Sequence, residues 1–210
     1  MLSGCIAAAS SIATELDRGL RLGIVTKLLS PWGLIPPKPG GPFSAGWVSG
    51  ASLIVRRAVF EEVGLLDEGL YTYFDDPDLC LRAARAGWET WYVPDSRVVH
   101  LAGATTGLTG NRPPVRRPDY WHQARRRYFL KHHGAWYTAL ADAAFILGFA
   151  IWRVRRRLQR KPDTDPPRLL IDSIRHSVFC AGPRIPVVEN PALREAAIRP
   201  AEPQGQSSAC

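Results

Sequence analysis

The sequence has 210 residues, of which 46% are hydrophobic and 22% are charged, and it includes seven Trp and seven Phe. This composition allows one or two folded domains and excludes a wholly disordered chain, which would lack these aliphatic and aromatic side chains. Four scattered cysteines without CxxC or Cys/His spacing argue against a disulfide scaffold and a zinc site, and they fit a reducing compartment.

The formal net charge of +8 is concentrated in one segment. Between Arg112 and Lys161 there are thirteen Lys and Arg but only two acids, Asp119 and Asp142, whereas the remainder has fourteen bases and seventeen acids. No helix-turn-helix, zinc or ribonucleoprotein motif accompanies the basic segment. We therefore expect no nucleic acid partner and look for another reason for the charge.

The N-terminal region, residues 1–45, carries no clear chemistry. Residues 1–13 are apolar but have no positively charged start, so we expect a short helix or a plain stretch of chain and not a signal peptide. Residues 17–30 predict mixed helix and loop. Residues 31–43 contain five prolines and predict an extended connector.

The central segment, residues 46–110, differs in composition from the proline-rich residues before it. Residues 47–55 (WVSGASLIV) predict a buried strand with a close backbone approach at its small residues. Residues 56–63 predict a helix that packs on this strand and ends at Gly64 in a left-handed cap. Further on, residues 90–93 and 97–101 predict two short strands joined by a turn at 94–96.

An acidic cluster begins the next predicted helix. Asp76 is placed as the N-cap, Pro77 as the first helical residue and Asp78 as a complement to the helix dipole, and Gly87 ends the helix. Three carboxylates within four residues exceed what capping requires. Crowded carboxylates raise one another's pKa, which suits a general base, unless a divalent cation absorbs the repulsion. A solvated cap without catalytic function is the alternative that these residues leave open.

The ordered series of these segments resembles the acceptor half of glycosyltransferase family 2, and its rhamnosyltransferase-like branch in particular. The resemblance is strong over residues 46–107 and weaker over residues 120–134. It is carried by WVSGA at 47–51, VGLLDE at 63–68, YFDDPDLCLR at 73–82, AGW at 86–88 and VP to VH at 93–100.

The resemblance implies an α/β fold, specifically a partial GT-A glycosyltransferase domain followed by helices and a disordered tail. It makes Asp76 the catalytic base of an inverting transfer, beside Asp75, which stands where the family usually has Glu. His100 would help to hold a divalent metal, Mg²⁺ or Mn²⁺, on the donor diphosphate, although a plain strand-end histidine is an equal alternative. The implied substrate-binding residues are Trp47, Ser49, Gly50, Ala51 and Asp78.

Family members place a nucleotide-binding half with an Asp-x-Asp motif before such a segment, and that half would take roughly a hundred residues. Residues 1–45 show no alternating strands and helices. We therefore expect a truncated or split glycosyltransferase that uses a nucleotide-sugar donor and a polysaccharide or polyprenyl-lipid-linked acceptor in bacterial cell-surface glycan synthesis, with a separate nucleotide-binding half as a possible partner. The alternative is an inactive remnant or partner subunit that binds membrane or a nucleotide-binding polypeptide.

The basic region, residues 111–160, predicts a helix at 120–133 followed by an apolar run at 135–152. An interfacial helix on an anionic membrane surface fits this pattern, with a spanning helix and a packed soluble helix as alternatives. Asp142 argues against spanning. The expected location is cytoplasmic, peripheral at the inner face of the cell membrane. The residues expected to face lipid are Arg125, Arg126, Arg127, Trp152, Arg153, Arg155 and Arg156.

The last region, residues 161–210, predicts a linker and one helix near 169–180. The chain beyond Gly182 is rich in proline and polar residues, so we expect little fixed structure there.

Overall fold

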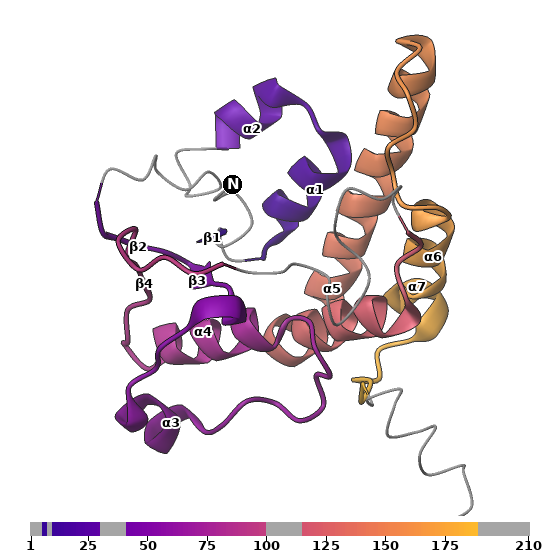
Figure 1. Ribbon diagram of the computed structural model, residues 1–210. Coiled ribbons are helices and arrows are strands. Elements are labelled where there is room, and N and C mark those ends of the chain that lie inside the picture. Colours follow the sequence, from indigo (N-terminus) through magenta and orange to yellow (C-terminus); the bar gives the residue numbers. More distant parts are fainter. Residues whose placement is uncertain (1–5, 8–9, 30–40, 100–114, 189–210) are drawn as a thin grey trace, which may run out of the picture.

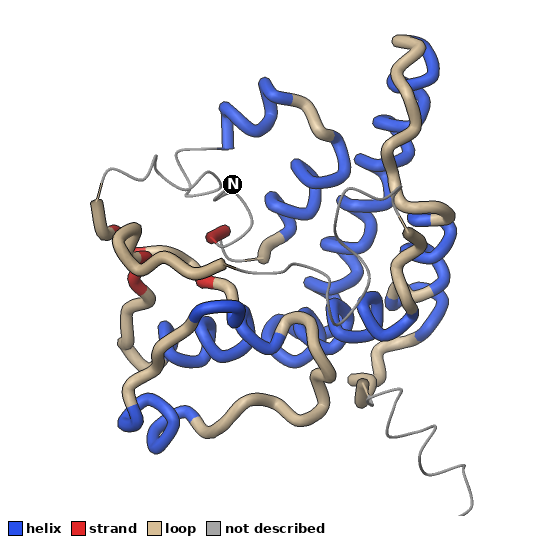
Figure 2. The backbone as a smooth tube through the Cα atoms, viewed as in Figure 1, coloured by secondary structure: helices blue, strands red, loops and turns tan. Residues whose placement is uncertain are grey.

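The structure, a computed structural model, describes residues 6–7, 10–29, 41–99 and 115–188. Within these ranges helices dominate and the strands are very short (Figures 1 and 2). The helices are α1 (Ile12–Leu20), α2 (Gly23–Leu29), α3 (Arg57–Val63), α4 (Asp75–Arg85), α5 (Asp119–Leu158), α6 (Leu169–Arg175) and α7 (Val178–Ala181).

Two antiparallel strand pairs lie on one side of α4 (Figure 1). β1 (Ile6–Ala7) pairs with β3 (Trp47–Val48), and β2 (Phe43–Ser44) pairs with β4 (Trp91–Tyr92). The predicted strand at 47–55 is therefore wrong beyond its second residue. The chain turns there into a 3₁₀ helix, Gly50–Ser52, because the Ser49 hydroxyl accepts the Ala51 N–H and caps that turn.

The strand predicted at 90–93 is confirmed by β4, and the turn after it by the Ser96 N–H, which donates to the Val93 carbonyl. Residues 97–99 form no strand, and the rest of that prediction, 100–101, lies outside the described residues. Helix α3 is confirmed, and it packs on α4. Gly64 follows it with a φ of 83° and a ψ of 171°, so the positive φ is confirmed but the left-handed helical cap is not.

Helix α4 begins two residues earlier than predicted, at Asp75 and not at Pro77. Its N-cap is Phe74, in the left-handed region with φ 68° and ψ 3°, and no side chain caps the helix. Asp76 is thus not the N-cap. All three aspartates instead lie in the first helical turn, where the positive end of the helix dipole favours carboxylates.

Helix α5 is two helices joined at Gly134, whose φ of 77° and ψ of 178° interrupt the helical backbone. Glycine adopts this conformation without steric strain, which explains its presence between the two segments. The helix predicted at 120–133 is confirmed, and the apolar run at 135–152 forms most of the second segment. In Figure 1 the first half of α5 lies roughly parallel to α4. The second half turns away from α4 and extends past the rest of the protein.

Helix α1 packs along the second half of α5, where two glycines allow the backbones to approach. A Cβ atom added to Gly19 would lie 2.7 Å from the Phe145 carbonyl oxygen, and one added to Gly148 would lie 3.0 Å from the Leu20 nitrogen. Phe145 and Phe149 are buried here with Leu169 of α6. These contacts join segments at opposite ends of the chain.

The first half of α5 forms a second part of the core. Tyr128 and Phe129 are buried with Ala141, and Phe74 packs against them. Val188 is also buried, and its N–H donates to the Gly69 carbonyl at 2.9 Å. The expectation of little fixed structure beyond Gly182 is therefore wrong for residues 183–188, while residues 189–210 lie outside the described part of the chain.

We predict that Gly19→Ala lowers the free energy of unfolding by about 1–3 kcal/mol, because the added methyl group meets rigid backbone of α5. Gly23→Ala is the matched control, since nothing lies within 4 Å of its added Cβ at the start of α2. Urea unfolding of both variants measures the difference. Equal stability of the two variants would contradict the close α1–α5 contact.

Candidate functional site

The first turn of α4 faces the 3₁₀ helix that follows β3. The Gly50 N–H donates to Oδ2 of Asp76 at 3.0 Å. Val48 of β3 and Cys80 of α4 are both buried, and α4 packs on β3. The structure thus brings together Asp76 and Gly50, two residues predicted for one site, although they are 26 positions apart.

Asp76 is the carboxyl group of this turn whose pKa is raised. Partial burial raises it first, the Gly50 N–H opposes that effect, and the neighbouring charge of Asp75 raises it further, to about 6. A carboxylate with a pKa of about 6 is ionised at neutral pH and accepts a proton more readily than an ordinary aspartate. Asp76 therefore has the property that a general base requires.

Asp78 has a different environment and is wholly buried. Lys131 Nζ donates to its Oδ1 at 2.7 Å, His132 Nε2 lies 2.7 Å from the same oxygen, and Arg82 Nε donates to Oδ2 at 2.9 Å. Burial would raise the pKa of Asp78, but these partners together lower it to about 2. The prediction that Asp78 binds substrate is corrected, because both oxygens are committed to contacts within the protein.

Arg82 extends this contact to the end of α3. Its guanidinium donates to the carbonyls of Val63, Gly64 and Leu65. Lys131 also binds Asp67, which Arg127 binds as well. The buried acid cluster, defined here as Asp67 and Asp78 with their basic partners, therefore connects α3, α4 and the first half of α5.

Of the other predicted site residues, all except His100 belong to the described part of the chain. Trp47 and Ser49 are half-buried, Ala51 is exposed, and Asp75 is half-buried in the same turn as Asp76. His100 lies outside the described residues. Among the described residues, no three His, Cys, Asp or Glu side chains lie close enough to hold a metal ion, so these residues alone do not form the expected metal site.

Sequence reasoning missed Lys131 and His132, and it assigned Arg127 to the wrong role. All three lie in the first half of α5, within the basic segment, and their pattern resembles a lipid-facing surface more than a set of partners for acids. Asp67 and Asp78 are 64 and 53 residues away from Lys131. The three carboxylates of the acidic motif, more than capping requires, were the signal that basic partners exist elsewhere in the chain.

Most residues expected to face lipid bind other parts of the protein instead. Arg125 binds Glu15 and Asp142, Arg127 binds Asp67, and Arg155 donates to two carbonyls at the end of α1. Arg156 binds Asp163 and Asp165, and the Trp152 indole N–H donates to Asp165. Arg126 and Arg153 are half-buried. The predicted lipid-facing set is therefore wrong for Arg125, Arg127, Arg155 and Arg156.

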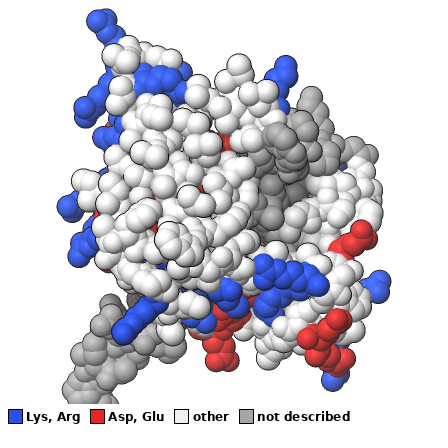
Figure 3. Space-filling view, turned by 180° about the vertical axis from the view of Figure 1, so that it is seen from behind, with Lys and Arg blue, Asp and Glu red and all other residues white. Residues whose placement is uncertain are grey.

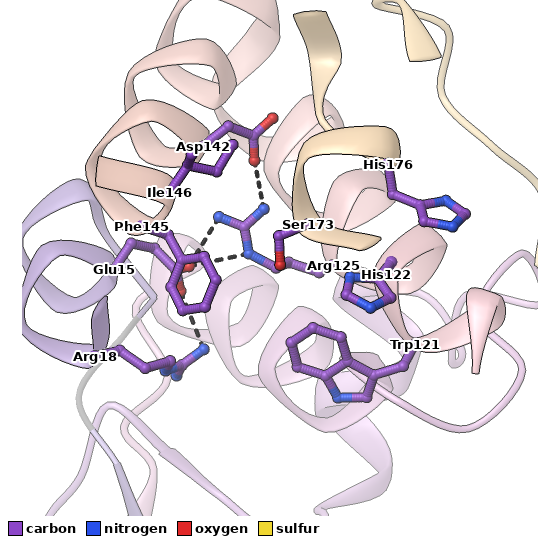
Figure 4. A pocket seen from close by; sticks show the side chains of 10 residues that line it. All are labelled: Glu15, Arg18, Trp121, His122, Arg125, Asp142, Phe145, Ile146, Ser173 and His176. Atoms are coloured by element: carbon purple, nitrogen blue, oxygen red, sulfur yellow. Dashed lines mark hydrogen bonds and ion pairs between the residues drawn. The ribbon is translucent and has the colours of Figure 1, made fainter. Parts of the chain in front are cut away.

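A small cavity lies elsewhere, between α1, α5 and α6. Figure 4 shows Arg125 between Glu15 and Asp142, with His122 and His176 beside them. The cavity volume of about 10 Å³ is about the least that holds one water molecule, so it does not accept a sugar. Burial would raise the pKa of Glu15, but Arg125 and Arg18 outweigh this and lower it. The residues that line this cavity hold α1, α5 and α6 together, and Asp76 is not among them.

Comparison with known proteins shows which family the site resembles. Residues 43–137 match the family described as "Glycosyltransferase like family 2". This segment is therefore similar to that family. The family 2 segment, as we call this range, contains β2, β3, β4, α3, α4 and the first half of α5.

Curated relatives of the family 2 segment are named as rhamnosyltransferases. The chain is 36% identical over 94 residues, 45% of its length, to an N-acetylglucosaminyl-diphospho-decaprenol L-rhamnosyltransferase of Mycobacterium tuberculosis, covering 29% of that protein. It is 28% identical over 110 residues to the dTDP-rhamnosyl transferase RfbF of Shigella flexneri, covering 50% of the chain and 37% of the relative. It is 39% identical over 56 residues to the rhamnosyltransferase WbbL of Escherichia coli, covering 27% and 21%.

The chain thus spans about a third of the length of the curated relatives it matches, 21–37% in these three cases. No solved structure matches it significantly. The resemblance noted in the sequence is confirmed at the level of the family, and the site residues within the family 2 segment remain predictions.

We predict that Asp78→Asn lowers the free energy of unfolding at pH 7 by about 3 kcal/mol, because Lys131, His132 and Arg82 lose a buried charged partner. The folded pKa of about 2 lies below the ordinary value of 3.8, so this stabilisation is present above about pH 4 and is lost as the pH falls toward 2. Urea unfolding at several pH values measures it.

The control for Asp78→Asn is Glu61→Gln, which removes the exposed Arg57–Glu61 pair and should change stability by no more than about 0.5 kcal/mol. An Asp78 variant as stable as this control would show that the buried acid cluster does not hold α4 in place.

We predict that Asp76→Asn has the opposite sign and stabilises the fold by about 1–2 kcal/mol above pH 6. The raised pKa means that ionised Asp76 opposes folding, whereas an amide keeps the acceptor for the Gly50 N–H without the charge. The gain should be full above about pH 6 and absent below about pH 4, where both states are protonated. Thermal unfolding at pH 4 and pH 8 checks it, and a loss of stability at pH 8 would contradict the raised pKa.

Proposed function

We propose that this chain carries the acceptor-activating part of an inverting glycosyltransferase of the GT-A type. The observation that supports the proposal best is Asp76, whose pKa of about 6 and contact with Gly50 occur inside the family 2 segment. The names of the relatives favour a rhamnosyl group as the transferred sugar, dTDP-rhamnose as the donor and a diphospho-polyprenyl-linked sugar as the acceptor.

In the proposed reaction Asp76 removes the proton from an acceptor hydroxyl. The oxygen attacks the anomeric carbon of the donor sugar, the bond between that carbon and the diphosphate oxygen breaks, and the electron pair leaves with the nucleoside diphosphate. The proton stays on Asp76 until solvent removes it. Attack from the side opposite to the leaving group inverts the configuration at the anomeric carbon.

The protein orients the Asp76 carboxylate as well as raising its pKa. The Gly50 N–H fixes one oxygen of Asp76 at 3.0 Å, which leaves the other oxygen for the acceptor. Phe74 precedes the turn with a φ of 68°, an uncommon conformation for a non-glycine residue, and its ring packs against Tyr128 of α5. These contacts hold the first turn of α4 rigidly, so that Asp76 is oriented before substrate binds.

Binding of the nucleotide-sugar donor is proposed to need a nucleotide-binding half in addition to the family 2 segment. The chain spans about a third of its relatives, and a nucleotide-binding half, supplied in the same or another polypeptide, is proposed to hold the nucleotide. A divalent cation, Mg²⁺ or Mn²⁺, stays a proposal for the donor diphosphate, because the described residues form no site for it. No step above requires that cation.

We predict that Asp76→Asn lowers the rate of rhamnosyl transfer about 10²–10⁴-fold, since it removes the proton acceptor. Because only ionised Asp76 accepts a proton, the wild-type rate should fall as the pH drops through about 6. The assay follows labelled rhamnose from dTDP-rhamnose to a polyprenyl-diphosphate-linked N-acetylglucosamine, with the chain alone and with a nucleotide-binding half of a relative added.

Asp75→Asn is the matched control for this assay. It should keep transfer within about tenfold and shift the acidic fall in rate to lower pH, because the charge of Asp75 raises the pKa of Asp76. Undiminished transfer by Asp76→Asn, or no transfer by the wild type with either arrangement, would overturn the proposed function. The second result would favour a partner subunit without catalytic activity.

A further inference from the structure

An apolar stripe runs along the outer face of the second half of α5. Its six members are large, exposed and hydrophobic, and we define the apolar stripe as Trp136, Leu140, Leu147, Ile151, Val154 and Leu158. Their exposed fractions range from 54% for Ile151 to 89% for Trp136. At 3.6 residues per turn, all six lie within about 60° of one another around the helix axis.

The opposite face of the same helix is also apolar but is already covered. Phe145 and Phe149 are buried there with Leu169 of α6 and against α1, and Ala141 is buried with Tyr128 and Phe129. By length and composition α5 is the one described helix that would be able to cross a membrane, yet only 33% of its most apolar window is buried in the protein. A helix that is apolar all round normally has protein or lipid on every side.

The charges around the stripe favour an anionic occupant. The only acid in this half of α5, Asp142, is buried and binds Arg125 and the Val178 N–H. At the projecting end of the helix Arg157, Arg160 and Lys161 are exposed. Figure 3 shows a broad, largely uncharged area on the back of the molecule, with Lys and Arg mainly along its edges.

We propose that the apolar stripe is a membrane-docking surface that lies on an anionic lipid leaflet. The apolar side chains would enter the boundary between headgroups and acyl chains, while Arg157, Arg160 and Lys161 would bind lipid phosphates. The helix lies along the surface and does not cross the membrane, because α1 covers its other face at backbone distance. This surface differs from the arginines expected from the sequence, and it does not depend on the proposed transfer reaction.

The test is flotation of the purified chain with vesicles of phosphatidylcholine alone and of phosphatidylcholine with 30% phosphatidylglycerol. The wild type is expected to float with the anionic vesicles and to lose binding at high salt. The double variant Leu147→Glu/Ile151→Glu should bind at least about tenfold more weakly. Each of Arg157→Gln, Arg160→Gln and Lys161→Gln should weaken binding about fivefold on anionic vesicles only.

The matched control is Ile24→Glu/Leu28→Glu on α2, an exposed apolar pair at the same helical spacing, which should float like the wild type. Circular dichroism confirms folding of every variant, since all the changed side chains are exposed. Flotation unaffected by Leu147→Glu/Ile151→Glu, or no flotation of the wild type, would overturn the proposal. A dimer in light scattering that this variant dissociates, without vesicle binding, would overturn it in favour of a second copy as the occupant.

Discussion

Asp78 joins three parts of the chain through one buried carboxylate. One oxygen contacts Lys131 and His132 of α5, and the other accepts from Arg82, which in turn clamps the end of α3. Transfer of such a charge from water into the protein is strongly unfavourable unless it is fully paired, so the first turn of α4 is held in one position relative to α5. Asp76, two residues earlier, is presented from that fixed turn toward Gly50.

Two aspartates of the acidic motif therefore differ in their pKa. Asp78 is buried and surrounded by bases, which lower its pKa, whereas Asp76 is only partly buried and has a like charge beside it, which raises its pKa. The same residue type thus serves as a buried anchor at one position and is the proposed proton acceptor at the other. Environment and not sequence identity sets the two roles.

Local patterns in the sequence predicted α3, the helix that carries the acidic motif and the raised pKa of crowded carboxylates, because helix periodicity and charge crowding act over a few residues. The role of Asp78 and the partners of the basic segment were not predictable in this way. Arg125 pairs with Glu15, which is 110 positions away in the sequence, and Lys131 pairs with Asp78, which is 53 positions away. Charge spacing alone shows that bases are clustered, and the tertiary packing decides whether they face solvent, lipid or buried acids.

The central claim is that the aspartates of α4 titrate differently, and carboxyl carbon NMR of the folded chain tests this directly. Resonances of Asp76 and Asp78 are assigned by Asp→Asn substitution and followed from pH 2 to pH 8. The account predicts a pKa of about 6 for Asp76 and about 2 for Asp78. If both groups titrate near the ordinary value of 3.8, Asp76 does not have the raised pKa proposed for a base, and Asp78 is not the buried ion-paired anchor of α4.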